Sequence, residues 1–458
     1  MKKTDLLIIG GSAGGLLTAT MARKAYGKDV AITLIRDTET VMVPCGIPYI
    51  FGTLRDIKKN RISDSGLTRA NINLVIDTAL GINRKEKTVT TRASGVIAYK
   101  KLVIATGSLP IIPTFIPGYD LTNVFAIKKD EEYLGKIFAQ MENAKNVVVI
   151  GGGFIGVEFA EQIRLLGKNV TLIEAAEACL WQAFDKKYTD HIEKLLKDNG
   201  INLLTKSRVR RILGEKSVEA VELEKGQKIP ADLVILGLGM KPNGALGRDC
   251  GLVMNDAGAI VVDQYMRTSD PDIFAVGDCA QKKCFFTGKG VPLLLASTAT
   301  MEAKIAGSNI FHLRLIRANK GTISTFATKI FGKTFAAAGL TEDRARQEGF
   351  CLMKGEFRTM DRHPGSLPDA QEVNIKLIFS RCSGVILGAQ ISGGNAVAEM
   401  INILSLAIQK GLTATELNTF QGATHPLISP SPAAYPINAA AMNAIATNCS
   451  HLNEDVII

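Results

Sequence analysis

Asn-Val-Val-Val-Ile-Gly-Gly-Gly-Phe-Ile-Gly, residues 146–156, is the stretch that decides the fold. An apolar run enters a complete Gly-x-Gly-x-x-Gly motif there. Such a junction predicts a βαβ unit, because the glycines let the backbone approach a pyrophosphate at the start of the next helix. The residues expected to line the dinucleotide are Gly151, Gly153, Phe154, Ile155 and Gly156.

The next predicted strand, residues 169–173, ends in a carboxylate. Glu174 follows the first glycine of the motif by about 20 residues. A carboxylate at this place accepts a hydrogen bond from a free ribose 2′-hydroxyl and repels a 2′-phosphate. The sequence therefore predicts a site that prefers NADH over NADPH.

The same pattern occurs at the start of the chain. Residues 5–9 lead into a glycine-rich loop, and residues 30–35 predict the next strand. The motif is imperfect because Ser12 stands where the second glycine would be, so a plain strand-to-helix turn is the alternative. Arg36 closes the strand, and the carboxylate for an adenosine ribose is therefore Asp37 or is missing. The residues assigned to this site are Gly10, Ser12, Ala13, Gly14, Gly15 and Asp37.

Three further apolar runs end in small residues and predict strands that return beside a nucleotide. Their end residues are Ala105, Thr106 and Gly107, then Gly239, then Gly277 and Asp278. The carboxylate of Asp278 follows a glycine at a strand end, where it could accept hydrogen bonds from a ribityl chain. An ordinary turn aspartate is the alternative.

A single cysteine stands between the first glycine loop and an apparent helix, in Val-Met-Val-Pro-Cys-Gly-Ile-Pro-Tyr, residues 41–49. A thiolate at a helix start is stabilised by the helix dipole and the free N–H groups, which lowers the pKa of the thiol. Cys45 is therefore predicted to be a redox nucleophile. The alternative is a small core residue among turn-forming neighbours.

Length and composition narrow the class of protein. The 458 residues suit about three domains, and the apolar fraction is 46%. No apolar run reaches the roughly 18 residues that span a bilayer, and Asp5 interrupts the one stretch that resembles a signal peptide. We therefore expect a cytoplasmic protein that does not bind membranes.

The cysteines and the net charge exclude two further classes. Eight cysteines lie scattered without Cys-x-x-Cys spacing, which predicts neither a metal site nor a disulfide framework. The net charge of +10 comes from small dispersed basic clusters rather than one long basic run. This favours phosphate-bearing small molecules over nucleic acid.

The C-terminal part predicts a sheet with a helix on one face. Residues 375–379 and 385–391 form a predicted hairpin, and residues 396–410 have apolar side chains at helical spacing before Gly411. A sheet covered in this way needs a partner surface. We expect the last ten or so residues to be frayed.

The ordered set of two glycine loops, Cys45, Ala-Thr-Gly at 105–107 and Ala-Val-Gly-Asp at 275–278 resembles the pyridine nucleotide-disulfide oxidoreductases over nearly the whole chain. The lack of a second cysteine near Cys45 is similar to the single-cysteine branch, which holds coenzyme A disulfide reductases, persulfide and polysulfide reductases, NADH oxidases and NADH peroxidase. The implied fold is α/β, with two Rossmann-like dinucleotide-binding domains and a C-terminal α+β dimerisation domain. The implied domains are 1–112 with 244–321 for FAD, 113–243 for NADH, 322–446 for dimerisation, and a tail at 447–458.

The resemblance also implies a reaction and roles for individual residues. Hydride from NADH would pass to FAD, and the reduced flavin would pass electrons to Cys45, which would reduce a coenzyme A disulfide, persulfide or polysulfide. During the reaction Cys45 would alternate between a thiolate and an oxidised form, which is a mixed disulfide, a persulfide or a sulfenic acid. Phe154 would be an aromatic gate over the flavin, and Glu158 would lie beside the nicotinamide. His425 would reach the site of the partner subunit in a homodimer, as an acid or base. The alternatives for these three residues are packing, a solvated carboxylate and a loop histidine.

Departures from the family pattern bear on the substrate. Ala13 occupies the place of a histidine found in the peroxidases, which weakens the sulfenic-acid reading. Arg-His-Pro-Gly at 362–365 stands where coenzyme A disulfide reductases carry a tyrosine, so His363 is a candidate proton donor. The alternative is that His363 is a surface histidine in a turn. Tyr435 is a weaker candidate for the same site. The basic residues proposed to clamp coenzyme A, unless they form a solvated face, are Arg55, Lys58, Lys59 and Arg61.

Two other activities fit the same motifs. An NADH oxidase would reduce oxygen directly and would need no sulfur substrate. An NADH-dependent reductase of a small electron-carrier protein would not need Cys45 and would use the basic surface to bind an acidic partner.

Overall fold

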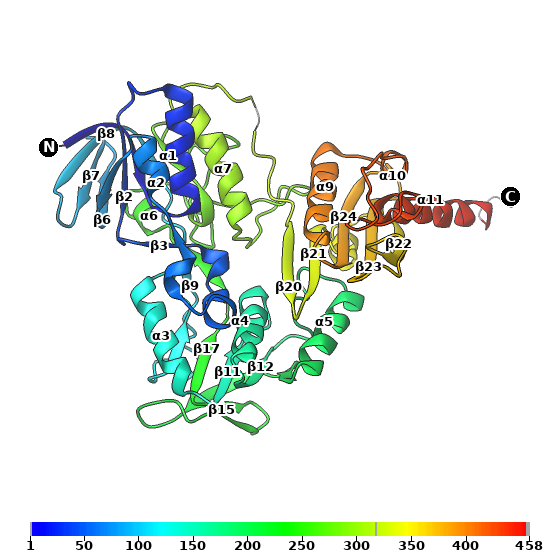
Figure 1. Cartoon of the computed structure of the whole chain (residues 1–458). Coiled ribbons are helices and arrows are strands. Elements are labelled where there is room, and N and C mark those ends of the chain that lie inside the picture. The colour runs from blue at the N-terminus through cyan, green and yellow to red at the C-terminus, as the bar shows by residue number, and fades with distance from the viewer. Residues whose placement is uncertain (1, 317, 455–458) are drawn as a thin grey trace.

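The computed structural model describes residues 2–316 and 318–454, with side chains up to residue 447. The chain forms three units, each built on its own sheet, and Figure 1 shows them side by side. The first unit takes the start of the chain and returns for α6 and α7, whereas the second and third follow in order.

The first unit is a mainly parallel sheet in the order β5-β2-β1-β8, with β19 beside β8. The register pairs Ile9 with both Ile35 and Ile104, and Ile104 with Ala275, so the carboxyl ends of four strands lie at one edge. The buried strands read as continuous apolar runs because both faces are covered. Its main elements are β1 (Lys2–Ile9), α1 (Ala13–Tyr26), β2 (Ile32–Arg36), α2 (Ser65–Arg69), β5 (Asn73–Ile76), β6 (Ala79–Asn83), β7 (Thr88–Thr91), β8 (Val96–Ile104), α6 (Ala245–Asp249), β19 (Ile273–Ala275) and α7 (Ala296–Asn309).

The second unit repeats this design with the strand order β10-β17-β11-β12-β13. All of these neighbours are parallel, and Ile150 pairs with both Ile173 and Leu236 at the carboxyl edge. Its elements are β10 (Val124–Ala126), α3 (Glu131–Asn143), β11 (Asn146–Ile150), α4 (Phe154–Leu165), β12 (Asn169–Ile173), α5 (Lys186–Asp198), β13 (Ile201–Leu204), an antiparallel sheet of β14 (Val209–Leu213), β15 (Ala220–Leu223) and β16 (Lys228–Pro230), and β17 (Leu233–Leu236). The connections between the two units pair as β9 (Ser108–Pro110) and β18 (Met240–Pro242).

The third unit is an antiparallel sheet in the order β20-β21-β24-β23-β22. Helix α9 packs on β21 and β24 and ends at Gly411, whose φ of 68° is the left-handed C-cap conformation. Helix α11 packs on β22 and β23. Its elements are β20 (Phe326–Ile330), β21 (Lys333–Gly339), α8 (Glu342–Gln347), β22 (Leu352–Met360), β23 (Glu372–Ser380), β24 (Ile386–Gly393), α9 (Val397–Lys410), α10 (Ala414–Asn418) and α11 (Pro436–Glu454).

The predicted fold class is confirmed, including two Rossmann-like sheets and a C-terminal α+β unit. The predicted frayed end differs from the structure, because α11 continues to Glu454. Residues 455–458 lie outside the described part of the chain. Among the described residues, no helix is both long and apolar enough to cross a membrane.

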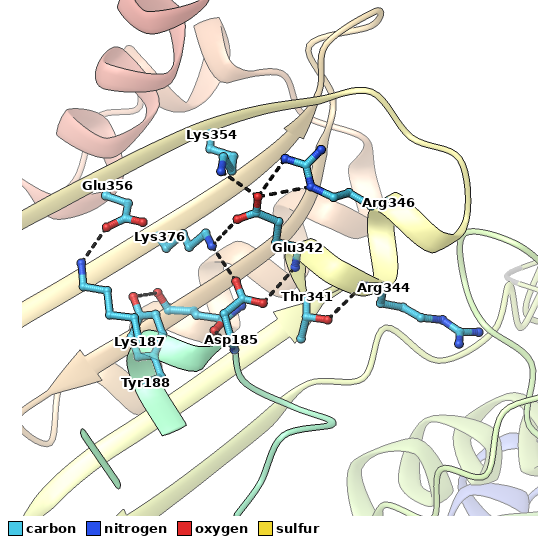
Figure 2. Close-up of polar contacts among 11 residues, drawn as sticks. Asp185, Lys187, Tyr188, Thr341, Glu342, Arg344, Arg346, Lys354, Glu356 and Lys376 are labelled. Carbon is cyan, nitrogen blue, oxygen red and sulfur yellow. Dashed lines mark hydrogen bonds and ion pairs between the residues drawn. The ribbon is translucent and has the colours of Figure 1, made fainter. Parts of the chain in front are cut away.

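A network of charged side chains joins the second unit to the third. Figure 2 shows Lys376 of β23 between two carboxylates, and its Nζ lies 2.7 Å from Asp185 Oδ2 and 2.7 Å from Glu342 Oε2. Asp185 is the N-cap of α5, and its Oδ1 also accepts the N–H of Glu342 at 3.0 Å. The buried Tyr188 of α5 donates to the carbonyl of Gln390 at 2.9 Å. Helix α5 is thereby held against the sheet of the third unit.

Candidate active site

The carboxyl edge of the first sheet forms a cradle with the shape that a dinucleotide needs. Gly10 has a φ of +117°, and a Cβ on it would lie 2.1 Å from the carbonyl oxygen of Ala105. A Cβ on Gly15 would lie 1.8 Å from the oxygen of Gly10, so both positions accept glycine alone. Gly14 faces Val276, and the loop, the Ala105–Gly107 turn and the strand before Gly277 meet at one place. The residues fit FAD at this edge.

Arg36 and Asp37 follow one another at the adenosine end of this cradle. The strand register places Arg36 where Glu174 stands in the second unit, and Asp37 is exposed beyond it. The buried Arg36 packs under Gly11 and pairs with Asp64 through two nitrogen–oxygen contacts of 2.6 Å. Arg36 has no acceptor atom for a ribose hydroxyl, so the prediction stays as it was made: Asp37, or no carboxylate at this position.

Asp278 lies in a polar cluster contributed by both nucleotide units. Its Oδ2 accepts the hydroxyl of Ser108 at 2.7 Å and lies 3.5 Å from Nζ of Lys129. Lys129 lies between β10 and α3, and its ammonium also contacts Ser108 Oγ at 3.3 Å. Nearby, the Thr106 hydroxyl donates to the carbonyl of Asn243 at 2.6 Å. A carboxylate held by these donors is preorganised to accept further hydrogen bonds from a polyol chain.

The second sheet carries the matching cradle. A Cβ on Gly151 would lie 2.5 Å from the oxygen of Gly237, and one on Gly156 would lie 1.8 Å from the oxygen of Gly151. A Cβ on Gly153 would meet no protein atom within 4 Å, as expected where the backbone faces a ligand. The geometry fits NADH at this edge.

Glu174 is fixed by the backbone around it. Its Oε2 accepts the N–H of Gly152 at 2.6 Å, and its Oε1 accepts the N–H of Ala176 at 2.6 Å. Its remaining lone pairs are available to the ribose hydroxyls of a dinucleotide.

We expect Glu174→Gln to lower the ratio of kcat/KM for NADH to that for NADPH by roughly 30-fold, since about 2 kcal/mol of repulsion towards a 2′-phosphate is lost. Initial rates with each nucleotide measure the ratio. Glu177→Gln is the matched control, because Glu177 lies in the same loop but pairs with Lys206 at the surface. An unchanged ratio in Glu174→Gln would remove Glu174 from the ribose site.

Cys45 lies in the 3₁₀ turn Pro44–Gly46 and is an exposed residue, although its thiol is partly shielded from solvent. The π-helical turn Ile50–Leu54 that follows packs against α4, where Phe51 lies 5.4 Å from Phe159 between ring centres. The Thr53 hydroxyl donates to Gln162 Oε1 of the same helix at 2.8 Å. The cysteine segment is thereby anchored to the second unit.

The expectation of a lowered thiol pKa is wrong. Partial burial raises the pKa of Cys45, the carboxylates of Glu158 and Asp278 raise it further, and Lys129 opposes them. The short turn does not supply the dipole of an α-helix, because the next helical residues begin at Ile50. The same charges nevertheless show that Cys45, Glu158 and Asp278 share one neighbourhood.

Glu158 lies on α4 beneath strand β20 of the third unit. The Thr328 hydroxyl donates to Glu158 Oε1 at 2.8 Å, and the N–H of Phe331 donates to Glu161 Oε1 at 2.6 Å. Burial raises the pKa of Glu158 to about 7, while the Thr328 hydrogen bond lowers it and Glu161 raises it. Phe154 stacks on Phe326 of the same strand, with ring centres 5.0 Å apart. One face of α4 is therefore covered by the third unit.

We expect Thr328→Val to move the ionisation of Glu158 upward by about one pH unit, because the carboxylate loses a charge-assisted hydrogen bond. The pH dependence of kcat/KM for NADH measures this, with Glu158→Gln identifying the inflection. Thr328→Ser should restore the wild-type profile. A downward movement in Thr328→Val would contradict the assignment.

His425 lies in the exposed segment between α10 and α11, where its Nδ1 accepts the N–H of Leu427 at 3.3 Å. In Figure 1 this part of the third unit lies away from the first unit, which carries Cys45. His363 meets the same segment, since its N–H donates to the carbonyl of Pro426 and its Nδ1 lies 3.0 Å from the carbonyl of Ser429. Tyr435, which begins the approach to α11, is buried beside Phe420. The structure thus brings His363 to the segment that carries His425, within the third unit.

The basic residues after Cys45, which were proposed to clamp coenzyme A, are partly engaged in contacts within the protein. Arg61 pairs with Glu131 of α3, and Arg55 donates to the carbonyl of Gly52 at 3.2 Å. Lys58 and Lys59 are exposed in the turn Ile57–Asn60. All four residues are exposed, and Arg61 is held by its ion pair with Glu131.

Sequence reasoning missed Ser108, Lys129 and Thr328. Ser108 directly follows the Ala-Thr-Gly motif, so its position was a usable signal. Lys129 and Thr328 lie in no recognisable motif, and only the packing of separate units brings them to Asp278 and Glu158.

Comparisons with known proteins agree with this geometry. A family model described as pyridine nucleotide-disulphide oxidoreductase matches residues 4–303, and the model of the corresponding dimerisation domain matches residues 325–434. An NADH oxidase of Methanocaldococcus jannaschii is 32% identical over 92% of this chain and 95% of its own length. An NAD(P)H coenzyme A polysulfide/persulfide reductase of Pyrococcus horikoshii is 31% identical over 90% of this chain and 93% of its own.

A solved structure is similar over nearly the whole chain. The NAD-dependent persulfide reductase from A. fulgidus has a TM-score of 0.89 and 33% identity, and the match covers 98% of this chain and 84% of that one. Relatives named for oxygen reduction and for sulfur reduction thus share this architecture.

Proposed function

The chain belongs to the pyridine nucleotide-disulphide oxidoreductases, and on that premise we propose that it is an FAD-dependent enzyme that uses NADH to reduce a small sulfur compound at Cys45. The substrate class is a coenzyme A disulfide, persulfide or polysulfide. The reductases of Pyrococcus horikoshii and A. fulgidus support sulfur as the acceptor.

One observation carries the proposal: the exposed residue Cys45 belongs to a segment of the first unit that packs on helix α4 of the second unit, where the charges of Glu158 and Asp278 act on its thiol. A nucleophile on a segment shared by the two units could receive through FAD the electrons that NADH supplies. The other six cysteines with described side chains are also free. Cys45 therefore acts without an internal disulfide partner.

The chemistry balances with one NADH for each disulfide. The Cys45 thiolate attacks one sulfur of RSSR, the S–S bond breaks, and the leaving thiolate takes a proton as RSH. Two electrons from NADH and a second proton then cleave the Cys45–S–S–R bond and release the second RSH. FAD, when bound, supplies the two-electron transfer between nucleotide and sulfur.

Residues of the chain hold each participant. The first cradle, with Gly10, Gly15 and Asp278, holds FAD, and the second cradle, with Glu174, holds NADH. Glu158, whose pKa near 7 suits proton transfer at neutral pH, would lie beside the nicotinamide of bound NADH. We assign these roles by their place at the two sheet edges.

We further propose a cytoplasmic homodimer, in which His425 and His363 complete the site of a second copy. Residues 325–434 match a dimerisation domain, and both histidines lie within these residues. The free state of the described cysteines fits a reducing compartment.

An anaerobic NADH titration of the purified yellow protein tests the proposal. We expect visible bleaching to need about two equivalents of NADH per subunit, with release of a small thiol seen by mass analysis, because Cys45 starts as a mixed disulfide. Bleaching with about one equivalent and no released thiol would favour a flavin that acts without sulfur.

An NADH oxidase that reduces oxygen is the second candidate. The raised pKa of the Cys45 thiol favours the neutral, less nucleophilic form, and the Methanocaldococcus jannaschii relative is named for oxidase activity. Oxygen uptake in the absence of any sulfur acceptor measures this activity.

A further inference from the structure

A buried ion pair lies behind the turn that carries Asp278. The side chains of Lys282 and Glu302 are 3% and 1% exposed, and Nζ lies 3.0 Å from Oε1 and 3.1 Å from Oε2. Two opposite charges removed from water are costly unless both are fully hydrogen-bonded. Such a pair needs a purpose other than stability.

The contacts of the pair converge on Gly277. Its N–H donates to Glu302 Oε2 at 2.8 Å, and its carbonyl accepts the Lys282 ammonium at 2.6 Å. The ammonium also donates to the carbonyl of Ala280 at 2.8 Å. With Glu302, these two carbonyls satisfy the three N–H donors of Lys282. Both polar groups of Gly277 are therefore held by opposite charges.

Lys282 and Glu302 together form a clamp on Gly277, and the position of this clamp points to the turn that would bind the ribityl chain. Gly277 has a φ of +74°, follows β19 and starts the 3₁₀ turn Gly277–Cys279. Glu302 lies on α7, which packs against α1 behind the first glycine loop. The two side chains thus tie the Asp278 turn to the helix layer of the unit.

We propose that Lys282 and Glu302 are positioning residues that hold the Gly277 turn so that Asp278 is preset for the ribityl chain of FAD. The clamp sets how tightly the protein retains FAD, because a preset carboxylate loses little freedom on binding. This inference rests on the proposed role of Asp278.

Titration of apoprotein with FAD tests the clamp. We expect Lys282→Met to raise the Kd for FAD by about tenfold or more, since two carbonyls lose a donor and Glu302 stays unpaired. The visible circular dichroism of bound FAD should change as well. Glu302→Gln keeps the size of the side chain and should raise the Kd in the same direction, which keeps the test open if Lys282→Met does not fold.

Arg84→Met is the matched control. Arg84 pairs with Asp270 at 2.9 Å in the same unit, away from the Gly277 turn. It should lower the melting temperature of the apoprotein while leaving the Kd for FAD within about twofold. Equal changes in Kd for Lys282→Met and Arg84→Met, at equal loss of apoprotein stability, would overturn the clamp.

A double variant separates the clamp from the role of Asp278. Asp278→Asn alone tests whether that carboxylate binds FAD, and an unchanged Kd would refute the proposed role. If Asp278→Asn weakens binding, adding Lys282→Met should weaken it less than the two single changes predict together. Full additivity would show that the clamp does not act through Asp278.

Discussion

Replacing Cys45 by serine should abolish reduction of sulfur substrates, with kcat falling more than about a thousandfold, because a hydroxyl cannot form the mixed disulfide. NADH should still bleach the visible absorbance of the protein, since the nucleotide cradles contain no part of Cys45. Oxygen uptake should persist and yield peroxide. Substrate-dependent thiol release, stopped-flow bleaching and peroxide assay measure the three quantities.

Cys351→Ser is the matched control for this change. Cys351 is also free and exposed, but it precedes β22 in the third unit. Its replacement should leave all three activities unchanged. Sulfur reduction that survives in Cys45→Ser and falls in Cys351→Ser would transfer the redox role to the third unit.

Lys376→Met should destabilise the contact between the second and third units by about 3 kcal/mol, because two carboxylates would lose their shared buried cation. The side chain of Lys376 is 9% exposed. Although burial raises the pKa of Glu342, hydrogen bonds from Lys354, Lys376 and Arg346 lower it to about 2.

The sign of the pH dependence follows from that lowered pKa. The stabilisation by Glu342 is present above the ordinary carboxyl pKa and is lost as the pH falls from about 4.5 towards 2. The difference between wild type and Lys376→Met should therefore persist between about pH 5 and 8. Thermal unfolding and limited proteolysis across this range measure it.

Lys187→Met provides the comparison within the same network. Lys187 pairs with Glu356 at the edge of the cluster in Figure 2. The two side chains are 55% and 45% exposed. Its loss should cost less than about 0.5 kcal/mol, because an exposed pair is screened by solvent. Equal losses of stability in Lys187→Met and Lys376→Met would show that the burial of Lys376 does not strengthen its ion pairs.

The sequence by itself determined the two nucleotide cradles. Gly10, Gly15, Gly151 and Gly156 sit in local patterns, and a glycine-rich loop between a strand and a helix is fixed by contacts a few residues apart. The strand ending at Ile173 and the carboxylate of Glu174 were also predicted where the structure has them. Local hydrogen bonding and burial act over such short separations, so the order of residues is sufficient.

Tertiary structure alone decided what surrounds the reactive groups. The sequence placed Arg36 at the end of its strand, but only the structure shows that its guanidinium is buried and pairs with Asp64. The thiol pKa of Cys45 is raised because burial and the carboxylates of Glu158 and Asp278 outweigh the charge of Lys129, and because the short turn provides no helix dipole. Thr328 reaches Glu158 across 170 residues of sequence. Such contacts depend on how separate units pack against one another. A local pattern of side chains does not reveal which residues from different units will meet.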